Sequence, residues 1–263
     1  MRLLTRTDPW TEHRRRATEL GTAEPHAAEI LRLYLALLDV WSESAGPIQA
    51  APPAAAELPA FAVRTLLPGV LGATLAAGPL ALRESVLRRF EEADLADLVA
   101  CWLAGAELPP VDRYLARAAA APILELVPDL ARATGSTGRD SRHCPACGGL
   151  PQLAYFGKSE EALVTAPRRL VCSRCSESWI YPRMICAGCG NPDTTGLPVY
   201  SDAERFPGLR IDACEVCRTY LVTVDLPKNP AAEPVVDELA ALPLDLFARE
   251  RGFTKITPNL VGF

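Results

Sequence analysis

The chain has 263 residues, of which 49% are hydrophobic, and a formal net charge of −5. This length is enough for one large domain or two to three smaller ones with a sizeable core. The acidic balance, with a pI near 5.4, disfavours a general nucleic-acid binder, because phosphate contacts need a basic surface. Residues 1–16 contain no apolar segment typical of a secretory signal, and no run of eighteen apolar residues occurs. We therefore expect a soluble, cytoplasmic protein without a membrane span.

The N-terminal half, residues 1–133, is predicted to form an all-helical domain. Apolar side chains recur there at helical spacing, as in the stripe over 25–42, and no alternation typical of strands occurs. Residues 46–59 are rich in alanine and proline and are expected to form an irregular loop. Further helices are predicted over 66–77, over 80–104 with a break near Asp94, and over 111–133 with kinks at Pro122 and Pro128.

Two features of this half have simple structural explanations. The run Arg14-Arg15-Arg16 is more simply a solvated helix face than a binding patch. Cys101 stands beside Trp102 and Leu103. A lone cysteine among apolar residues is most often a small core residue, so we do not expect Cys101 to be a metal ligand.

Residues 134–142 are rich in Gly, Ser and Thr and are predicted to be a linker. Beyond it, eight of the nine cysteines form four C-x-x-C pairs. The gaps 147–172 and 189–214 each leave 24 residues between two pairs, and a shift of 42 residues superimposes the first four cysteines on the second four. The segment is therefore a tandem repeat of C-x2-C-x24-C-x2-C, with the pairs Cys144/Cys147, Cys172/Cys175, Cys186/Cys189 and Cys214/Cys217.

Four thiolates in each copy are what a tetrahedral sulfur site needs, so the repeat predicts two metal ions. Spacing alone fits zinc and iron equally. The alternative, a disulfide framework, is disfavoured in a chain with no visible export signal. One ion is assigned to Cys144, Cys147, Cys172 and Cys175, and the other to Cys186, Cys189, Cys214 and Cys217. Cross-pairing between the two repeats is the main alternative.

The residue that follows each pair differs between the leading and trailing members of a copy. Gly148 and Gly190 follow the leading pairs, and glycine allows a positive φ that can turn backbone amides toward the sulfurs. Ser176 and Arg218 follow the trailing pairs. We therefore expect the trailing turns to have a different local geometry.

The cysteine repeat is predicted to form two four-cysteine modules, over 143–185 and 186–228. Each copy is too small to bury a stabilising core unaided, so metal is expected to supply the difference. Residues 229–263 are predicted to return to helix, over 235–251, with a kink at Pro243. Strands are expected over 153–156, 169–171, 178–181, 197–200, 209–211 and 220–224.

The cysteine motifs and their context resemble the FdhE family of formate dehydrogenase accessory proteins. The matching segments are His143–Pro151, Cys172–Trp179, Cys186–Gly190, Cys214–Leu221, Asp237–Leu242 and Pro258-Asn259. The resemblance implies a multidomain α+β fold, in which a helical N-terminal domain precedes two tandem rubredoxin-like or zinc-ribbon-like four-cysteine modules and a C-terminal helix. It also implies a cytoplasmic maturation factor that binds the catalytic subunit of formate dehydrogenase before export, and it favours iron as the metal.

The residues outside the cysteine pairs favour an accessory protein over an enzyme. The three histidines are His13, His26 and His143, and no Ser/His/Asp set or phosphate-binding loop is evident. His143 could tune the first metal site, but it is more simply a surface residue.

Three alternatives remain open. The first is a rubredoxin-type electron carrier that uses the same eight ligands with iron. The second is a zinc ribbon that binds nucleic acid through nearby arginines. However, a metal site with four thiolates has a net negative charge, which gives those arginines a local electrostatic reason to be there. The third is a thiol–disulfide oxidoreductase, which would not need four C-x-x-C pairs. The arginines expected to cluster around the first site are Arg168, Arg169, Arg174 and Arg183.

Overall fold

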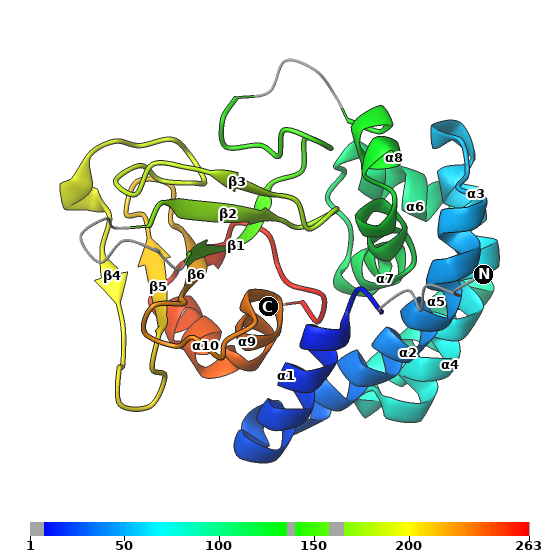
Figure 1. The fold of residues 1–263 in the computed structure, drawn as a ribbon, viewed down its shortest axis with the longest axis horizontal. Coiled ribbons are helices and arrows are strands. Elements are labelled where there is room, and N and C mark those ends of the chain that lie inside the picture. The colour runs from blue at the N-terminus through cyan, green and yellow to red at the C-terminus, as the bar shows by residue number, and fades with distance from the viewer. Residues whose placement is uncertain (1–7, 136–139, 158–165, 263) are drawn as a thin grey trace, which may run out of the picture.

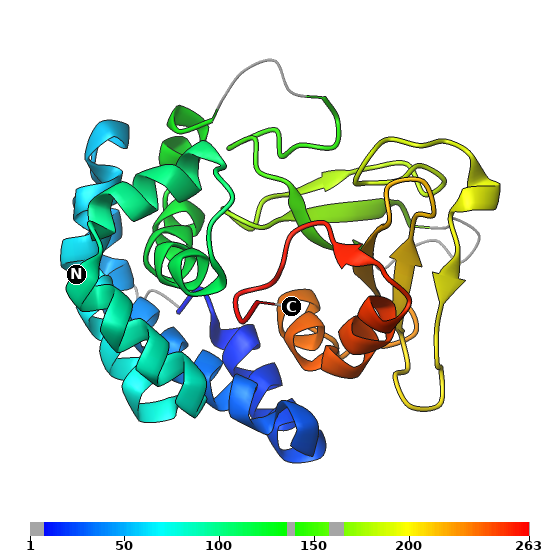
Figure 2. The same cartoon turned by 180° about the vertical axis from the view of Figure 1, so that it is seen from behind.

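The computed structural model describes residues 8–135, 140–157 and 166–262. A bundle of helices forms one side of the molecule, and a twisted sheet with two helices against it forms the other (Figures 1 and 2). The helices α1 and α9 lie where the two sides meet (Figure 1). The fold is therefore the predicted one, a helical N-terminal part followed by a sheet that carries two groups of four cysteines.

The helical part is organised around one buried helix, α7. Its alanines Ala118–Ala120 are fully buried, and their small side chains let α2, α3, α4, α5 and α6 pack closely around it. The bounds are α1 Thr11–Ala23, α2 Ala28–Ala50, α3 Leu58–Thr65, α4 Leu67–Ala77, α5 Leu80–Glu92, α6 Leu95–Ala104, α7 Pro110–Leu126 and α8 Pro128–Ala133, with short 3-10 turns at Pro25–Ala27 and Ala55–Glu57.

Proline acts differently at its two predicted positions in the last helical segment. At Pro128 the segment divides into α7 and α8. Pro122 lies inside α7, where its missing N–H leaves the carbonyl of Ala118 without the usual helical donor. The indole Nε1 of Trp41 donates to that carbonyl at 3.0 Å. The helix can therefore continue through Pro122, because a neighbouring helix satisfies the freed acceptor.

The predicted break near Asp94 is confirmed, and the predicted loop over 46–59 is partly wrong. Asp94 caps α6 by accepting from the amides of Ala96 and Asp97, each at 3.1 Å. In contrast, α2 runs on to Ala50 through Pro47. Its last turns bury Ile48, so packing against the bundle outweighs the local cost of the proline.

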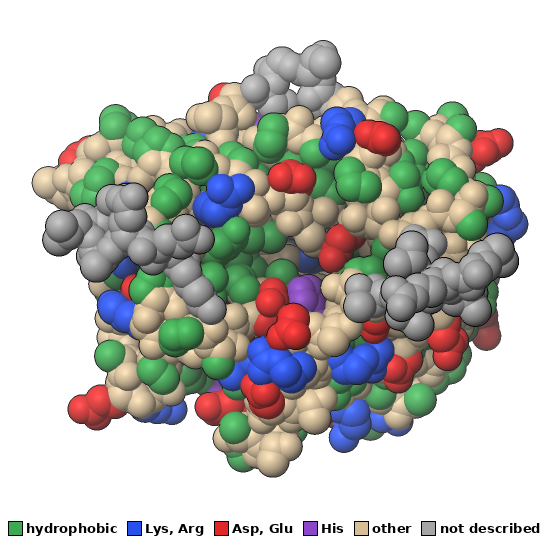
Figure 3. Space-filling view, viewed as in Figure 1, with side chains coloured by type: hydrophobic (Ala, Val, Ile, Leu, Met, Phe, Trp, Pro, Cys, Tyr) green, Lys and Arg blue, Asp and Glu red, His purple; other side chains and the backbone are tan. Residues whose placement is uncertain are grey.

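Two predictions for single residues in this part need correction. Cys101 is only partly buried, so it is not a core residue. Arg14 and Arg15 form the expected solvated face, where they pair with acidic neighbours, and acidic and basic side chains alternate on the surface in Figure 3. Arg16 differs, because both Nε and Nη2 reach Asp237 on α9, at 2.9 and 2.6 Å. Asp237 is buried, so this arginine joins the helical part to the C-terminal part.

The seven strands within the described ranges form one sheet in the order β3-β2-β1-β6-β5-β4, with β7 also paired to β6. Each cysteine repeat contributes three antiparallel strands. A parallel pair, from Leu153↔Val222 to Phe156↔Asp225, joins the two halves. The bounds are β1 Pro151–Phe156, β2 Arg168–Cys172, β3 Ser178–Ile180, β4 Val199–Tyr200, β5 Leu209–Ala213, β6 Thr219–Asp225 and β7 Thr254–Lys255.

Six of these strands match the predicted segments, and β7 was not predicted. The C-terminal helix predicted over 235–251 is divided into α9 (Pro234–Ala240) and α10 (Leu242–Glu250). The break falls just before Pro243, close to the predicted kink. Both helices pack against the sheet, α9 on β1 and β6 and α10 on β5 and β6.

Within the described ranges, no single helix is long and apolar enough to cross a membrane. The segments Ala55–Thr65 and Leu67–Ala77 meet that test of length and composition only as a pair, which is bent by 42°.

A buried polar network ties the C-terminal segment to the sheet. Lys255 on β7 donates to Glu238 on α9 and to Asp245 on α10, where Nζ lies 3.0 Å from Oδ1. Gln152 on β1 donates to Glu238 at 2.7 Å, and Tyr220 on β6 donates to Asp245 at 2.8 Å. Burial raises the pKa of Glu238, and the Lys255 ammonium opposes that rise. The ammonium therefore offsets part of the cost of burying the Glu238 carboxylate.

We expect Lys255→Met to destabilise the protein by about 3–5 kcal/mol, because it leaves two buried carboxylates without their cation. The measurement is the free energy of unfolding from urea denaturation of the metal-loaded protein. Lys228→Met is the matched control: Lys228 is 72% exposed and pairs with Asp225 at the surface, so a change within about 0.5 kcal/mol is expected. Equal effects of the two variants would contradict a structural role for the buried network.

Candidate metal sites

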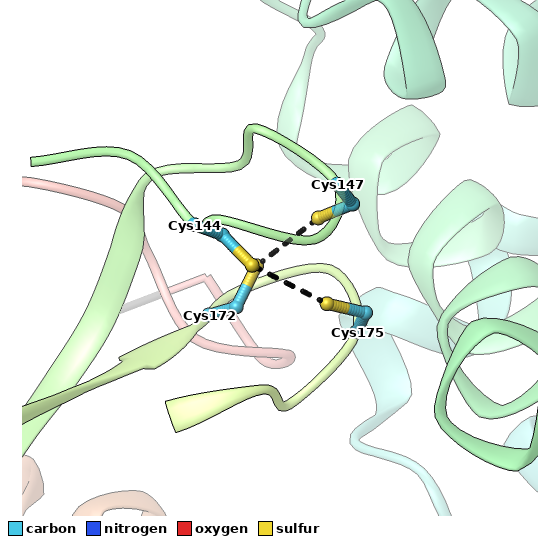
Figure 4. Close-up of side chains that lie close together, drawn as sticks. All are labelled: Cys144, Cys147, Cys172 and Cys175. Atoms are coloured by element: carbon cyan, nitrogen blue, oxygen red, sulfur yellow. Dashed lines mark hydrogen bonds between the residues drawn. The ribbon is translucent and has the colours of Figure 1, made fainter. Parts of the chain in front are cut away.

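The eight cysteines gather into two groups, each drawn from one copy of the repeat. In the first group, Cys144 and Cys147 lie in the turn before β1, while Cys172 ends β2 and Cys175 lies in the turn that follows (Figure 4). The second group repeats this plan with the turn after β3 and the turn between β5 and β6. Two hairpin-like turns therefore present their sulfurs to one point in each copy.

The spacing of the sulfurs fits a tetrahedral metal site. In the first group, Sγ of Cys144 lies 3.7 Å from that of Cys175, and Cys147 and Cys172 are 3.4 Å apart. The corresponding distances in the second group are 3.7 and 3.8 Å. Four sulfurs bound at about 2.3 Å to one ion would be separated by about 3.8 Å, whereas a disulfide needs about 2.05 Å. Each group could therefore hold one metal ion.

Each of the four C-x-x-C pairs is followed by a residue with a positive φ. The φ angles of Gly148 and Gly190 are 69° and 78°, as predicted. Ser176 and Arg218 also have positive φ, at 58° and 56°, so the prediction that the trailing turns differ is wrong. The left-handed conformation costs a residue with a side chain about 1–2 kcal/mol, which contacts elsewhere must offset.

Both non-glycine residues are held by contacts outside their own turn. Ser176 donates from Oγ to Glu125 on α7 at 3.1 Å. The guanidinium of Arg218 lies 4.0 Å from the centre of the Phe253 ring and donates to the carbonyl of Arg251. These partners come from segments far away in the sequence, so the local motif could not reveal them.

Several donors point at the sulfurs. The amide of Arg174 donates to Sγ of Cys172 at 3.4 Å, and the amide of Gly188 donates to Cys186 at 3.3 Å. Burial opposes ionisation of Cys217, but hydrogen bonds, including one from Thr219 at 3.0 Å, lower its pKa to about 7. These donors favour the thiolate, the form of cysteine that binds metal, but burial still raises the pKa of Cys186 to about 12.

The two groups differ in their exposure. All four cysteines of the first group are buried, whereas Cys189 of the second is exposed and Cys217 is half-buried. The helical part covers the first group: Arg174 donates to the carbonyl of Leu103 at 2.9 Å, and Ser176 is held by Glu125. The same motif therefore occurs once inside the molecule and once near its surface.

The arginines expected around the first site are dispersed. Arg174 is the member of this set whose amide contacts a sulfur of the first group. Arg168 is buried beside Asp212 in the second copy, and Arg183 lies over the Phe156 ring. Arg169 hydrogen-bonds to Ser178. The prediction of one cluster around the first site is therefore wrong, and each arginine has its own structural partners.

Sequence reasoning placed His143 on the surface beside the first site and did not single out Glu125. His143 is mostly covered and pairs through Nδ1 with Asp140 at 3.0 Å, so it is directed toward a carboxylate.

Glu125 is buried, which raises its pKa, and it accepts from Trp10 and from Ser176 of the first site. A lone acidic residue in a helical pattern gives no sequence signal of such a contact.

Comparison with known proteins identifies the sheet-containing part. A family model described as "FdhE, C-terminal domain" matches residues 184–261, which include the second four-cysteine group and both C-terminal helices. The "Protein FdhE homolog" of Aquifex aeolicus is 33% identical over 121 residues, which are 46% of this chain and 42% of the relative. The homolog of Haemophilus influenzae strain PittGG is 34% identical over 115 residues, 43% of this chain and 36% of the relative. The matched region thus spans less than half the length of either relative.

The fold as a whole also has a counterpart among solved structures. The crystal structure of the FdhE protein from Pseudomonas aeruginosa matches with a TM-score of 0.68, over 97% of this chain and 96% of that one, at 22% identity. The match extends over both the helical and the sheet-containing parts. The resemblance noted in the cysteine motifs is thereby confirmed: residues 184–261 match the model of the FdhE C-terminal domain, and the chain shares the fold of an FdhE protein along nearly its whole length.

Proposed function

We propose that this protein is an accessory factor for the maturation of formate dehydrogenase, which binds the catalytic subunit in the cytoplasm and has no turnover of its own. The observation that carries the proposal is the likeness to FdhE proteins, by sequence over residues 184–261 and by fold over nearly the whole chain. A protein that recognises a partner needs rigid surface loops, and the C-x-x-C turns of the second group, which lies near the surface, can provide them.

We propose further that each four-cysteine group holds one metal ion, with iron favoured by the family resemblance and zinc also compatible with four thiolates. The fit of the sulfur separations to a tetrahedron supports this assignment. Bound metal would neutralise part of the thiolate charge and cross-link two turns that are far apart in the sequence. The chain itself contributes the left-handed turns and the amide donors, which prepare the sulfurs for binding.

A rubredoxin-type electron carrier is the second candidate. The exposure of Cys189 favours it, because a metal near the surface can exchange electrons with a partner. Reversible one-electron redox chemistry of bound iron, in the absence of any complex with formate dehydrogenase, would favour this candidate over the accessory role.

The first prediction concerns metal stoichiometry. Wild type purified without oxygen should contain two metal ions per chain, and Cys144→Ser and Cys186→Ser should each retain one, because the two ligand sets share no cysteine. Elemental analysis against protein concentration measures this. Cys101→Ser is the control and should keep both ions, since Cys101 lies outside both groups. Two ions in either ligand variant would show that the assignment is wrong.

The second prediction concerns metal release. A chelator should remove one equivalent from wild type several-fold faster than the other, because the second group is open to solvent and the first is covered by the helical part. A chromogenic chelator records the two phases. The Cys144→Ser variant should retain only the fast phase, and Cys186→Ser only the slow one. Release from both groups at one rate would mean that burial does not control access.

The third prediction tests the accessory role. The catalytic subunit of formate dehydrogenase should co-purify with wild type and with Cys101→Ser, and more weakly with Cys144→Ser and Cys186→Ser, since loss of a metal ligand loosens the turns. A strain that lacks the protein should lose formate dehydrogenase activity, and wild type should restore it. Normal enzyme maturation in that strain, together with no detectable complex, would refute the proposed function.

A further inference from the structure

A hollow of about 270 Å³ lies between the two cysteine repeats. Three arginines line it, Arg168 from the first repeat, Arg210 from the second, and Arg183 from the segment between β3 and the second group. We call this hollow the arginine groove and define it by these three residues together with the apolar Met184, Leu197 and Val199. Its volume is below the roughly 300–1,000 Å³ of pockets for drug-sized ligands, so it has room for one or two side chains.

Arg168 lines the groove and carries a buried donor without a hydrogen-bond partner. Its residue is only 4% exposed. Nη1 donates to the carbonyl of Ile185 at 3.3 Å and Nη2 lies 3.6 Å from Asp212, but Nε has no hydrogen-bond partner. A buried donor without a partner is costly, so an acceptor that enters the groove would gain more than a surface contact does.

The other two arginines are oriented by the Phe156 ring. The guanidinium carbons of Arg183 and Arg210 lie 4.1 and 4.7 Å from its centre. Stacking on an aromatic ring leaves the edges of a guanidinium free to bind a carboxylate. Nη2 of Arg183 already donates to the carbonyl of Ala166, and Nε and Nη2 of Arg210 face Asp212. The remaining N–H groups of both side chains can donate into the groove while the stacking is kept.

The charge of the groove is opposite to that of the whole chain. Among the described residues that line it, the one carboxylate is Asp212, which lies 2.9 Å from Nε of Arg210. Three guanidinium groups thus face one carboxylate and the sulfur of Cys186, which also lines the groove, in a chain with a formal net charge of −5. Such a local excess of positive charge attracts an acidic partner and repels basic ones.

The rim of the groove suits an extended, partly apolar segment. Val199 and Met184 are 53% and 59% exposed, unusually high for large apolar side chains beside a hollow. Val199 belongs to β4, the last strand of the sheet, which pairs on one side only in the described chain. An incoming strand could therefore extend the sheet while alternate side chains enter the groove.

We propose that the arginine groove binds an extended segment of a partner polypeptide in which acidic side chains alternate with apolar ones. The carboxylates would accept from Arg168, Arg183 and Arg210, and the apolar side chains would cover Val199 and Met184. This inference rests on the proposed function only for the identity of the partner, the catalytic subunit of formate dehydrogenase. A purely structural explanation, that the arginines balance the charge of the second four-cysteine group, predicts no such binding.

The test uses the full-length, metal-loaded protein and a fluorescein-labelled peptide, Glu-Leu-Glu-Val-Glu-Leu, with its glutamine counterpart as the neutral probe. Arg183→Ala/Arg210→Ala removes two donors that lie outside the fully buried core, and thermal unfolding checks that the fold is kept. Arg205→Ala is the matched control, because Arg205 is also an exposed arginine over an aromatic ring, Phe206, but does not line the groove. Fluorescence anisotropy should show the acidic peptide bound by wild type and by the control, and about tenfold more weakly by the double variant.

Equal binding of the acidic peptide by all three proteins, or equal binding of the neutral peptide, would overturn the inference. Two results together would also overturn the inference: millimolar sulfate displaces the peptide, and the variants do not differ in binding to the catalytic subunit. They would show that the groove is an adventitious anion site. The catalytic subunit is tested on the same proteins by biolayer interferometry. If wild type binds the peptide but not the subunit, the groove stands and the proposed partner fails. If the subunit binds all three proteins equally, the accessory role stands and the groove is not its binding site.

Discussion

The parallel pairing of β1 with β6 is the constraint on which the rest of the structure depends. Two neighbouring parallel strands cannot be joined by a short turn. Most of both cysteine repeats therefore lies between β1 and β6 along the chain. The pairing makes one sheet from two small halves, and that sheet offers a face wide enough for α9 and α10. It also brings Phe156, at the end of β1, to the boundary between the repeats, where Arg183 and Arg210 stack on it.

The features that depend on local pattern could be predicted from the sequence. The strands beside the cysteine pairs, the break at Asp94 and the positive φ of Gly148 and Gly190 each follow from a few neighbouring residues. The grouping of the sulfurs within each copy was predicted from the repeat, with cross-pairing between the copies as the alternative, and the structure brings together the four sulfurs of each copy. The FdhE likeness was visible in the same motifs and is now supported along nearly the whole fold.

The features that depend on distant contacts could not be predicted. Helix α2 continues through Pro47 because Ile48 is buried by the bundle, and the sequence shows only the helix-breaking residue. Ser176 adopts a backbone conformation typical of glycine because Glu125, on a helix of the N-terminal part, holds its side chain. Arg16 was interpreted from its basic neighbours, whereas its partner Asp237 lies near the other end of the chain. In each case a tertiary contact outweighs the local preference.

The arrangement of the strands shows how the two copies associate. In the first copy the order is β3-β2-β1, and in the second it is β6-β5-β4, so the first strand of one copy contacts the last strand of the next. This is a head-to-tail contact between unlike edges, and here the described sheet stays open from β3 to β4. In the second copy, β4 occupies the place that β1 has in the first copy. One edge of β1 pairs with β6, and the corresponding edge of β4 is its outer edge. A duplication of this kind therefore ends with an edge already shaped to accept one more strand, and a different polypeptide can supply it.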